Sequence, residues 1–222
     1  MTAGALPSVF AIWKPKGISS NEALTRLKKM CGTKKAGHAG TLDPLAEGIL
    51  VVGVGRDGTK ALSELLLKEK EYSAEIMLGV RSTTDDEEGE KTYRDVSKIP
   101  TQHSVERAIS HFIGEIMQVP PRYSAVHVKG KKAYTRARMG EAFLLAPRPV
   151  QIKSVEILSY VWPKLSVQVV TGPGAYIRAL ARDIGEELGT GGYLSSLVRT
   201  RVGDFTRKNV IPFEALYGYE SH

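Results

Sequence analysis

Apolar and polar residues alternate with two different periods along this chain, and the periods predict both strands and helices. Residues 9–13 form a short apolar run, and residues 49–54 form a nearly continuous one that is typical of a buried strand. Residues 71–78 alternate apolar and polar side chains, as a half-exposed strand does. Further strands are predicted over residues 123–128, 150–161, 165–171 and 194–202.

Segments with a helical period separate these strands. Residues 21–30 carry apolar side chains three or four positions apart, so we expect an amphipathic helix that Ser19 or Ser20 caps. Paired strands with helices between them favour an α+β fold, in which helices and loops flank a mixed, mostly antiparallel sheet. The 222 residues contain no repeat or long linker, and we expect a single domain over 1–222. The other predicted helices cover residues 61–67, 105–116, 131–139 and 176–188.

The composition indicates which class of partner the protein binds. The formal net charge of +7 favours a phosphate-rich partner. Cys31 is the only cysteine, which excludes an intrachain disulfide, and the five histidines lack metal-ligand spacing, so we expect no metal site. No apolar run approaches the roughly 20 residues of a membrane span, and residues 1–7 do not read as a signal peptide. We therefore expect a cytoplasmic protein with no membrane partner.

Residues 37–48 carry the strongest chemical signal. They read Gly-His-Ala-Gly-Thr-Leu-Asp-Pro-Leu-Ala-Glu-Gly, so three glycines surround the carboxylate of Asp43. Pro44 fixes its own φ and pushes Asp43 out of the helical region. A carboxylate on a stiff loop beside Lys35 and His38 suggests chemistry on an anionic substrate. The same residues also fit a helix start, with Asp43 as N-cap and one helical turn over residues 45–47, and the two interpretations are compatible.

Residues 53–58 support a rival hypothesis. They match the dinucleotide-binding fingerprint G-x-G-x-x-G between a predicted strand and a helix. Glu75 lies near the distance expected of a ribose-binding acid, so an NAD-dependent oxidoreductase that uses the loop from Gly53 to Gly58 is the alternative. Against it, the strand around Glu75 alternates where a buried parallel strand is apolar throughout, and no second βαβ unit follows.

Seven motifs follow one another along nearly the whole chain. They are Lys14-Pro15-x-Gly17-x-Ser19-Ser20, Gly37-His38-Ala39-Gly40-Thr41-Leu42-Asp43-Pro44, Lys70-Glu71-Tyr72, Asp86-Glu87-Glu88-Gly89, Pro120-Pro121-x-Tyr123-Ser124-Ala125, Gly174-Ala175-Tyr176-Ile177-Arg178-x-Leu180 and Leu197-Val198-Arg199-Thr200-Arg201-Val202-Gly203-Asp204-Phe205. In this order they resemble the TruB family of tRNA pseudouridine synthases. These enzymes isomerise a uridine in the T loop of transfer RNA, at position 55.

The resemblance implies that Asp43 is the catalytic carboxylate of an isomerase that flips its target base. The reaction detaches uracil from ribose, turns the ring over and reattaches it through carbon 5, so the bonds balance and no cofactor is needed. The resemblance also implies that Arg178 pairs with the carboxylate and that Tyr72 stacks on the base. The aspartate acts either as a nucleophile, on the ring or the ribose, or as the base that forms a glycal; the sequence leaves these routes open.

Further roles come from the same resemblance. Tyr176, Ile177 and Leu197 correspond to walls of the pocket, His38 to a residue that replaces the flipped base in the RNA stack, and Asp86 to an aspartate near the active site. The expected partner is the T arm of tRNA, bound by a monomer. Basic residues are expected to bind its phosphates; they are Lys14, Lys16, Lys28, Lys29, Lys34, Lys35, Lys131, Lys132 and Arg136.

The chain departs from the family pattern in three places. His127 stands where the family usually has lysine, and Thr83 replaces an aspartate in the turn before Asp86. The chain stops at His222, so we expect a short form that lacks the C-terminal RNA-binding domain of PUA type. The expected lack of this domain leaves a further alternative open, a non-catalytic tRNA-folding chaperone. The presence of the catalytic residues argues against it.

Overall fold

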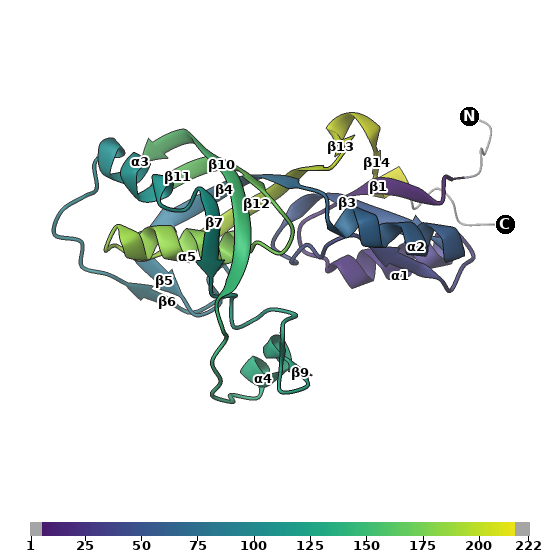
Figure 1. Ribbon diagram of the computed structural model, residues 1–222, viewed down its shortest axis with the longest axis horizontal. Helices are drawn as coiled ribbons and strands as arrows, with labels where there is room; N and C mark the ends of the chain where they lie inside the picture. Colours follow the sequence, from purple (N-terminus) through teal and green to yellow (C-terminus); the bar gives the residue numbers. More distant parts are fainter. Residues whose placement is uncertain (1–5, 216–222) are drawn as a thin grey trace. The chain divides into compact units, whose positions relative to one another are not determined.

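The computed structural model describes residues 6–215, whose contacts cluster into two compact units (Figure 1). Unit 1 comprises residues 6–72 and 197–215, and unit 2 comprises residues 73–196. Strands β4 (Lys70–Leu78) and β12 (Gly192–Val202) each contribute residues to both units. The single catalytic domain over 1–222 stays a prediction. So does the lack of a signal peptide, which concerns residues that lie mostly outside those described.

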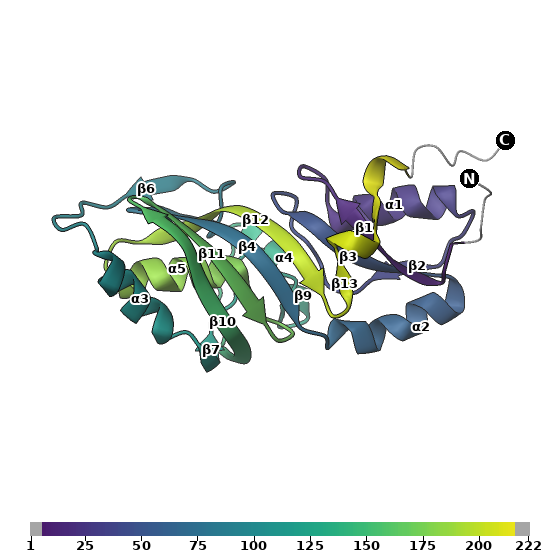
Figure 2. The same cartoon turned by 90° about the horizontal axis from the view of Figure 1, so that it is seen from above.

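Unit 1 is a sheet packed against two helices. Its strand order is β14-β1-β3-β12, with β2 paired to β3 and β13 to β12. The β1–β3 pair is antiparallel, whereas β1–β14 and β3–β12 are parallel. Helices α1 and α2 pack against β2 and β3 (Figure 2). The bounds are β1 Val9–Lys14, α1 Ser20–Met30, β2 Ala36–His38, β3 Glu47–Val54, α2 Gly55–Leu66, β13 Phe205–Thr206, the 3-10 helix η1 Arg207–Asn209 and β14 Val210–Pro212.

Unit 2 contains a second run of strands and the helix that carries Arg178. Its strand order is β12-β4-β11-β10-β7, and β10 is antiparallel to both β11 and β7. The pairs β5–β6 and β8–β9 form separate two-stranded sheets. The bounds are β5 Val80–Ser82, β6 Lys91–Tyr93, α3 Gln102–Ser110, β7 Gly114–Gln118, β8 His127–Val128, β9 Lys131–Lys132, α4 Ala133–Arg138, β10 Arg148–Val161, β11 Lys164–Thr171 and α5 Ile177–Glu187.

The apolar faces predicted from the sequence are buried. In α1 the residues at helical spacing, Ala23, Leu24 and Leu27, are buried, and the N-cap Ser19 hydroxyl accepts from the Glu22 N–H at 3.1 Å. Strand β4 alternates buried and half-buried residues over its whole length. The α+β fold with a mixed, mostly antiparallel sheet is therefore confirmed.

Helix α2 begins at Gly55, six residues before the predicted start at residue 61. The glycines at its start do not form a loop; they allow close packing of the backbone. A Cβ on Gly58 would lie 2.0 Å from the carbonyl oxygen of Ser8, and one on Gly53 would lie 2.3 Å from that of Gly58. These glycines let the first turn of α2 approach β1 and β3 closely. A dinucleotide-binding unit has parallel neighbouring strands before and after its helix. Here β4, the strand that follows α2, does not pair with β3, which lies between β1 and β12, and the oxidoreductase hypothesis is not favoured.

Three predicted elements of unit 2 are wrong in extent. The predicted helix 105–116 ends at Ser110 in α3, because Gly114 has φ +108 and β7 then pairs with β10. The predicted strand 123–128 is reduced to β8, and the predicted helix 131–139 is divided into β9 and α4. These pieces belong to an arm, residues 119–147, whose α4 and β9 project away from the rest of unit 2 in Figure 1.

Candidate active site

The Asp43 loop, residues 40–46, precedes β3 in unit 1. The Ala46 N–H donates to the Asp43 carbonyl at 3.1 Å, which closes a turn through Pro44. Glu47 already belongs to β3. The alternative of a helical turn over residues 45–47 is therefore wrong: Asp43 begins a tight turn that leads into a strand. Its side chain is half-buried.

The start of α1 fixes the backbone on both sides of Asp43. The buried Ser20 hydroxyl accepts from the Leu42 N–H at 2.8 Å and donates to the Leu42 carbonyl at 2.9 Å. The Gly17 N–H donates to the Pro44 carbonyl at 2.8 Å. Because both neighbours of Asp43 are held, the loop has the stiffness that the sequence predicts.

Arg199 on β12 also holds this loop, and sequence reasoning did not single it out. It is 1% exposed, and its guanidinium donates to the carbonyls of Gly40 at 3.0 Å, Thr41 at 3.4 Å and Ile49 at 2.7 Å. Gly48 faces Arg199 in the parallel register and has φ +115. A Cβ at Gly48 would lie 2.3 Å from the Arg199 carbonyl oxygen, so only glycine permits this approach.

Two of the three predicted catalytic residues lie around Arg199. Burial lowers the pKa of Arg199, whereas the Tyr72 side chain, which is hydrogen-bonded to it, and the Asp43 carboxylate act in the opposite direction. Tyr72 is buried on β4. Unit 1 thus brings a carboxylate and a phenol together beside one buried guanidinium.

Lys14 lies in the same place, which corrects its expected role. The sequence suggested a phosphate contact, but Lys14 is fully buried and its ammonium donates to the carbonyls of Pro15 and Ile18, both at 2.8 Å. Burial lowers the pKa of Lys14 to about 8, against the raising effect of Asp43. Because its ammonium does not reach the surface, Lys14 is an interior cation. Its positive charge favours a negative charge at Asp43.

His38 and Leu197 complete the predicted residues of unit 1. His38 lies on β2 opposite Val52 and is half-buried, and its Nδ1 has no hydrogen-bond partner within residues 6–215. Burial lowers the pKa of His38, and the charge of Arg199 lowers it further, so the imidazole is neutral at pH 7. Leu197 on β12 is 7% exposed.

Arg178 lies on α5 in unit 2, paired with Asp86. The guanidinium is 3.3 Å from Asp86 Oδ2 and donates to the carbonyls of Thr84 at 3.2 Å and Tyr123 at 3.0 Å. Asp86 Oδ1 accepts from the Thr84 hydroxyl and from the Glu88 N–H. Both partners of the ion pair are nearly fully buried. Asp86 is thus an interior residue that orients Arg178, although its acidic neighbours in the sequence favoured a solvated loop.

Tyr176 and Ile177 lie at the start of the same helix. Tyr176 is the N-cap of α5, and Ile177 is its first residue and is 5% exposed. The Gln118 side chain accepts from the Tyr176 N–H at 2.8 Å and donates to the Tyr176 carbonyl at 3.2 Å. Unit 2 therefore gathers the remaining predicted residues, Tyr176, Ile177, Arg178 and Asp86, around one helix end.

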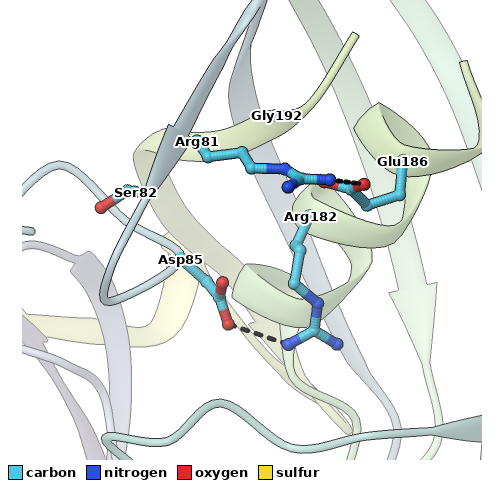
Figure 3. Close-up of a pocket in the computed structure, with 6 residues that line it drawn as sticks. All are labelled: Arg81, Ser82, Asp85, Arg182, Glu186 and Gly192. Atoms are coloured by element: carbon cyan, nitrogen blue, oxygen red, sulfur yellow. Dashed lines mark hydrogen bonds and ion pairs between the residues drawn. The ribbon is translucent and has the colours of Figure 1, made fainter. Parts of the chain in front are cut away.

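A neighbouring pocket of unit 2, of about 330 Å³, contains two further arginines (Figure 3). Arg182 donates to Asp85 at 2.9 Å, and Arg81 pairs with Glu186. Both guanidinium groups already pair with carboxylates, and the Arg182 ion pair holds Asp85, the residue before Asp86. Within residues 6–215, no group of three His, Cys, Asp or Glu side chains could hold a metal ion. No described helix is long and apolar enough to cross a membrane.

Each unit thus offers its own set of charged and polar groups. Unit 1 presents a carboxylate on a rigid loop beside two interior cations and a phenol, and such a carboxylate can serve as nucleophile or base. Unit 2 presents a guanidinium oriented by a second carboxylate. That Asp43 and Arg178 face one nucleotide stays a prediction.

Family models match almost the whole chain. The N-terminal domain model of the TruB family of pseudouridylate synthases matches residues 28–177, and the C-terminal domain model of tRNA pseudouridylate synthase B matches residues 178–221. This chain belongs to the TruB family of pseudouridylate synthases.

Two curated relatives are similar in sequence to this chain over most of their length. The chain is 43% identical over 210 residues to tRNA pseudouridine synthase B of Corynebacterium diphtheriae, covering 91% of this chain and 70% of that protein. It is 44% identical over 217 residues to tRNA pseudouridine synthase B of Burkholderia mallei, covering 97% of this chain and 71% of that protein.

Solved structures share the fold. A chain from a Cbf5-Nop10-Gar1 complex superposes with a TM-score of 0.71 at 28% identity, covering 96% of this chain and 55% of that one. A chain from an H/ACA RNP bound to a substrate RNA containing 2'-deoxyuridine gives a TM-score of 0.68 at 28% identity, covering 93% and 51%. The present chain therefore spans about half the length of these solved chains.

Proposed function

We propose that this chain isomerises a uridine of tRNA to pseudouridine, with Asp43 as the catalytic carboxylate. Membership of the TruB family supports the reaction. The observation that carries the assignment of Asp43 is the way its loop is built: Ser20, Gly17 and Arg199 hold the residues around it, and the side chain is left half-buried. A loop so constrained holds its carboxylate ready for reaction.

The reaction needs a reactive carboxylate and a closed pocket. The bond between ribose carbon 1 and uracil nitrogen 1 breaks, the ring turns, and a bond to carbon 5 replaces it, after which carbon 5 loses its proton and nitrogen 1 carries one in its place. Since one bond breaks and one forms, no cofactor is required. Asp43 acts as nucleophile on the ring or the ribose, or as the base of a glycal route.

The other residues divide the remaining work. Tyr72, held at Arg199, stacks on the flipped base, while Tyr176, Ile177 and Leu197 line the pocket. Arg178, which Asp86 orients, is assigned by the family resemblance the role of pairing with the catalytic carboxylate, whose ionised form a guanidinium favours. His38, neutral and half-buried, takes the place of the flipped base in the RNA stack. Stacking contributes about 1–3 kcal/mol per base, which offsets the cost of flipping.

The target that fits these roles best is the uridine at position 55 in the T loop of tRNA, bound by a monomer in the cytoplasm. A loop nucleotide costs less to extrude than one in a duplex. The net charge of +7 favours the RNA backbone, and Lys131 and Lys132 on the exposed β9 are available to it.

The test is to map pseudouridine in an unmodified tRNA transcript after incubation with the pure chain, by mass spectrometry of its digestion fragments after chemical labelling of pseudouridine. We expect one modified position, uridine 55. A transcript with cytidine at position 55 is the matched control and should stay unmodified. Absence of pseudouridine would refute the proposed activity, and modification elsewhere would refute the proposed target.

A further inference from the structure

The buried amide of Gln118 replaces a helix cap at the start of α5. The N-cap residue Tyr176 has no side-chain hydrogen bond that caps its own helix. Gln118, at the end of β7 and 1% exposed, binds both the N–H and the carbonyl of Tyr176, at 2.8 and 3.2 Å. Because unsupported first turns fray, these two hydrogen bonds fix the point at which α5 begins.

Two arginines of α5 contact the same stretch of chain just beyond Gln118. Arg182 donates to the Val119 carbonyl at 2.8 Å, and Arg178 donates to the Tyr123 carbonyl at 3.0 Å. With the Gln118 amide, these contacts join the base of the projecting arm to the first two turns of α5 (Figure 1). The position of the Arg178 guanidinium is therefore tied to the position of this short segment.

We propose that Gln118 is a positioning residue for the isomerisation: it holds the helix start that carries Tyr176 and Arg178 in the geometry that the reaction requires. This inference rests on the proposed function. Arg178 lies two residues after Tyr176, which Gln118 binds by two hydrogen bonds. A loosened first turn of α5 therefore displaces the Arg178 guanidinium directly. Small displacements of groups around a reacting centre, of about 1 Å, can cost about 100-fold in rate.

Two substitutions separate positioning from simple packing. Gln118→Met keeps the length and volume of the side chain but removes both hydrogen bonds to Tyr176. Gln118→Glu keeps the acceptor for the Tyr176 N–H and loses the donor to its carbonyl. Gln168→Ala, on β11 in the same unit, is the control, because that half-buried glutamine is bonded to neither Tyr176 nor Arg178.

The assay measures the single-turnover rate of tritium release from tRNA that carries uridine tritiated at carbon 5, as a function of enzyme concentration. We expect Gln118→Met to lower the maximal rate by about 10- to 100-fold while the half-saturating concentration changes less than about twofold. Gln118→Glu should fall between Gln118→Met and the wild type, and Gln168→Ala should match the wild type.

Other outcomes overturn the proposal. A wild-type maximal rate in Gln118→Met, even with a lower melting temperature, would assign Gln118 to stability alone, as would failure of both Gln118 variants to fold. A change confined to the half-saturating concentration would assign it to RNA binding. The proposed function fails separately, since it requires the wild-type chain to release tritium in this assay.

Discussion

Replacing Arg199 by methionine tests how strongly the Asp43 loop depends on one buried cation. The guanidinium makes three hydrogen bonds to the carbonyls of Ile49, Gly40 and Thr41. Hydrogen bonds to charged groups contribute about 1.5–3 kcal/mol each, so the three sum to roughly 4.5–9 kcal/mol. Methionine recovers part of this, because burying a guanidinium itself costs several kcal/mol. We expect a net loss of about 3–5 kcal/mol in the free energy of unfolding.

The measurement is urea unfolding of the wild type and of Arg199→Met, followed by circular dichroism. The matched control is Arg201→Met, on the same strand, whose partly exposed side chain pairs with Glu69 at 2.6 Å and Glu71 at 3.6 Å. That change should cost no more than about 1 kcal/mol. If Arg199→Met and Arg201→Met lost the same small amount, the assigned role of Arg199 would be refuted.

Three more predictions concern catalysis, pH and salt. Arg178→Ala should lower the rate of pseudouridine formation by about 100-fold or more while tRNA affinity in a filter-binding assay changes little; an unchanged rate would remove its proposed role. Because burial lowers the pKa of Lys14 from 10.5 to about 8, the unfolded chain binds more protons than the folded one between these values, and stability gains from rising pH there. Lys14→Met should therefore reduce the slope of unfolding free energy against pH, measured in urea from pH 8 to 10, by up to about 1.4 kcal/mol per pH unit; an unaltered slope would contradict the burial of Lys14. Replacing both Lys131 and Lys132 by alanine should reduce the slope of log Kd for tRNA against log salt by about 0.7–0.9 for each phosphate that these lysines neutralise, and an unaltered slope would show that β9 does not bind phosphates.

Local chemistry made the constrained loop at Asp43 and several strands predictable. Pro44 and the surrounding glycines indicated a stiff loop at Asp43, and the structure confirms that its neighbours are hydrogen-bonded on both sides. Strands were predicted over residues 150–161 and 165–171, and the structure confirms them as β10 and β11. In each case the signal lies within a few residues of the feature that it predicts.

The supports of the loop depend on contacts across long stretches of chain, which local patterns do not carry. Arg199 contacts Ile49, 150 residues earlier, and its burial follows from the strand register that places it opposite Gly48. Nothing adjacent to Arg199 distinguishes it from Arg201, which is partly exposed. Lys14 likewise resembles a surface lysine until the pairing of β1 with β3 places it inside.

Asp43→Asn shows whether the Asp43 carboxylate performs the isomerisation, because the amide has the shape of the carboxylate without its charge. Asp57→Asn, at an exposed position on α2, is the matched control. The measurement is tritium release from tRNA labelled at carbon 5 of uridine, together with the Kd for the same tRNA. We predict that Asp43→Asn releases no tritium and binds with nearly the wild-type Kd, whereas Asp57→Asn matches the wild type in both. Release by Asp43→Asn at the wild-type rate would show that the reaction does not need the Asp43 carboxylate.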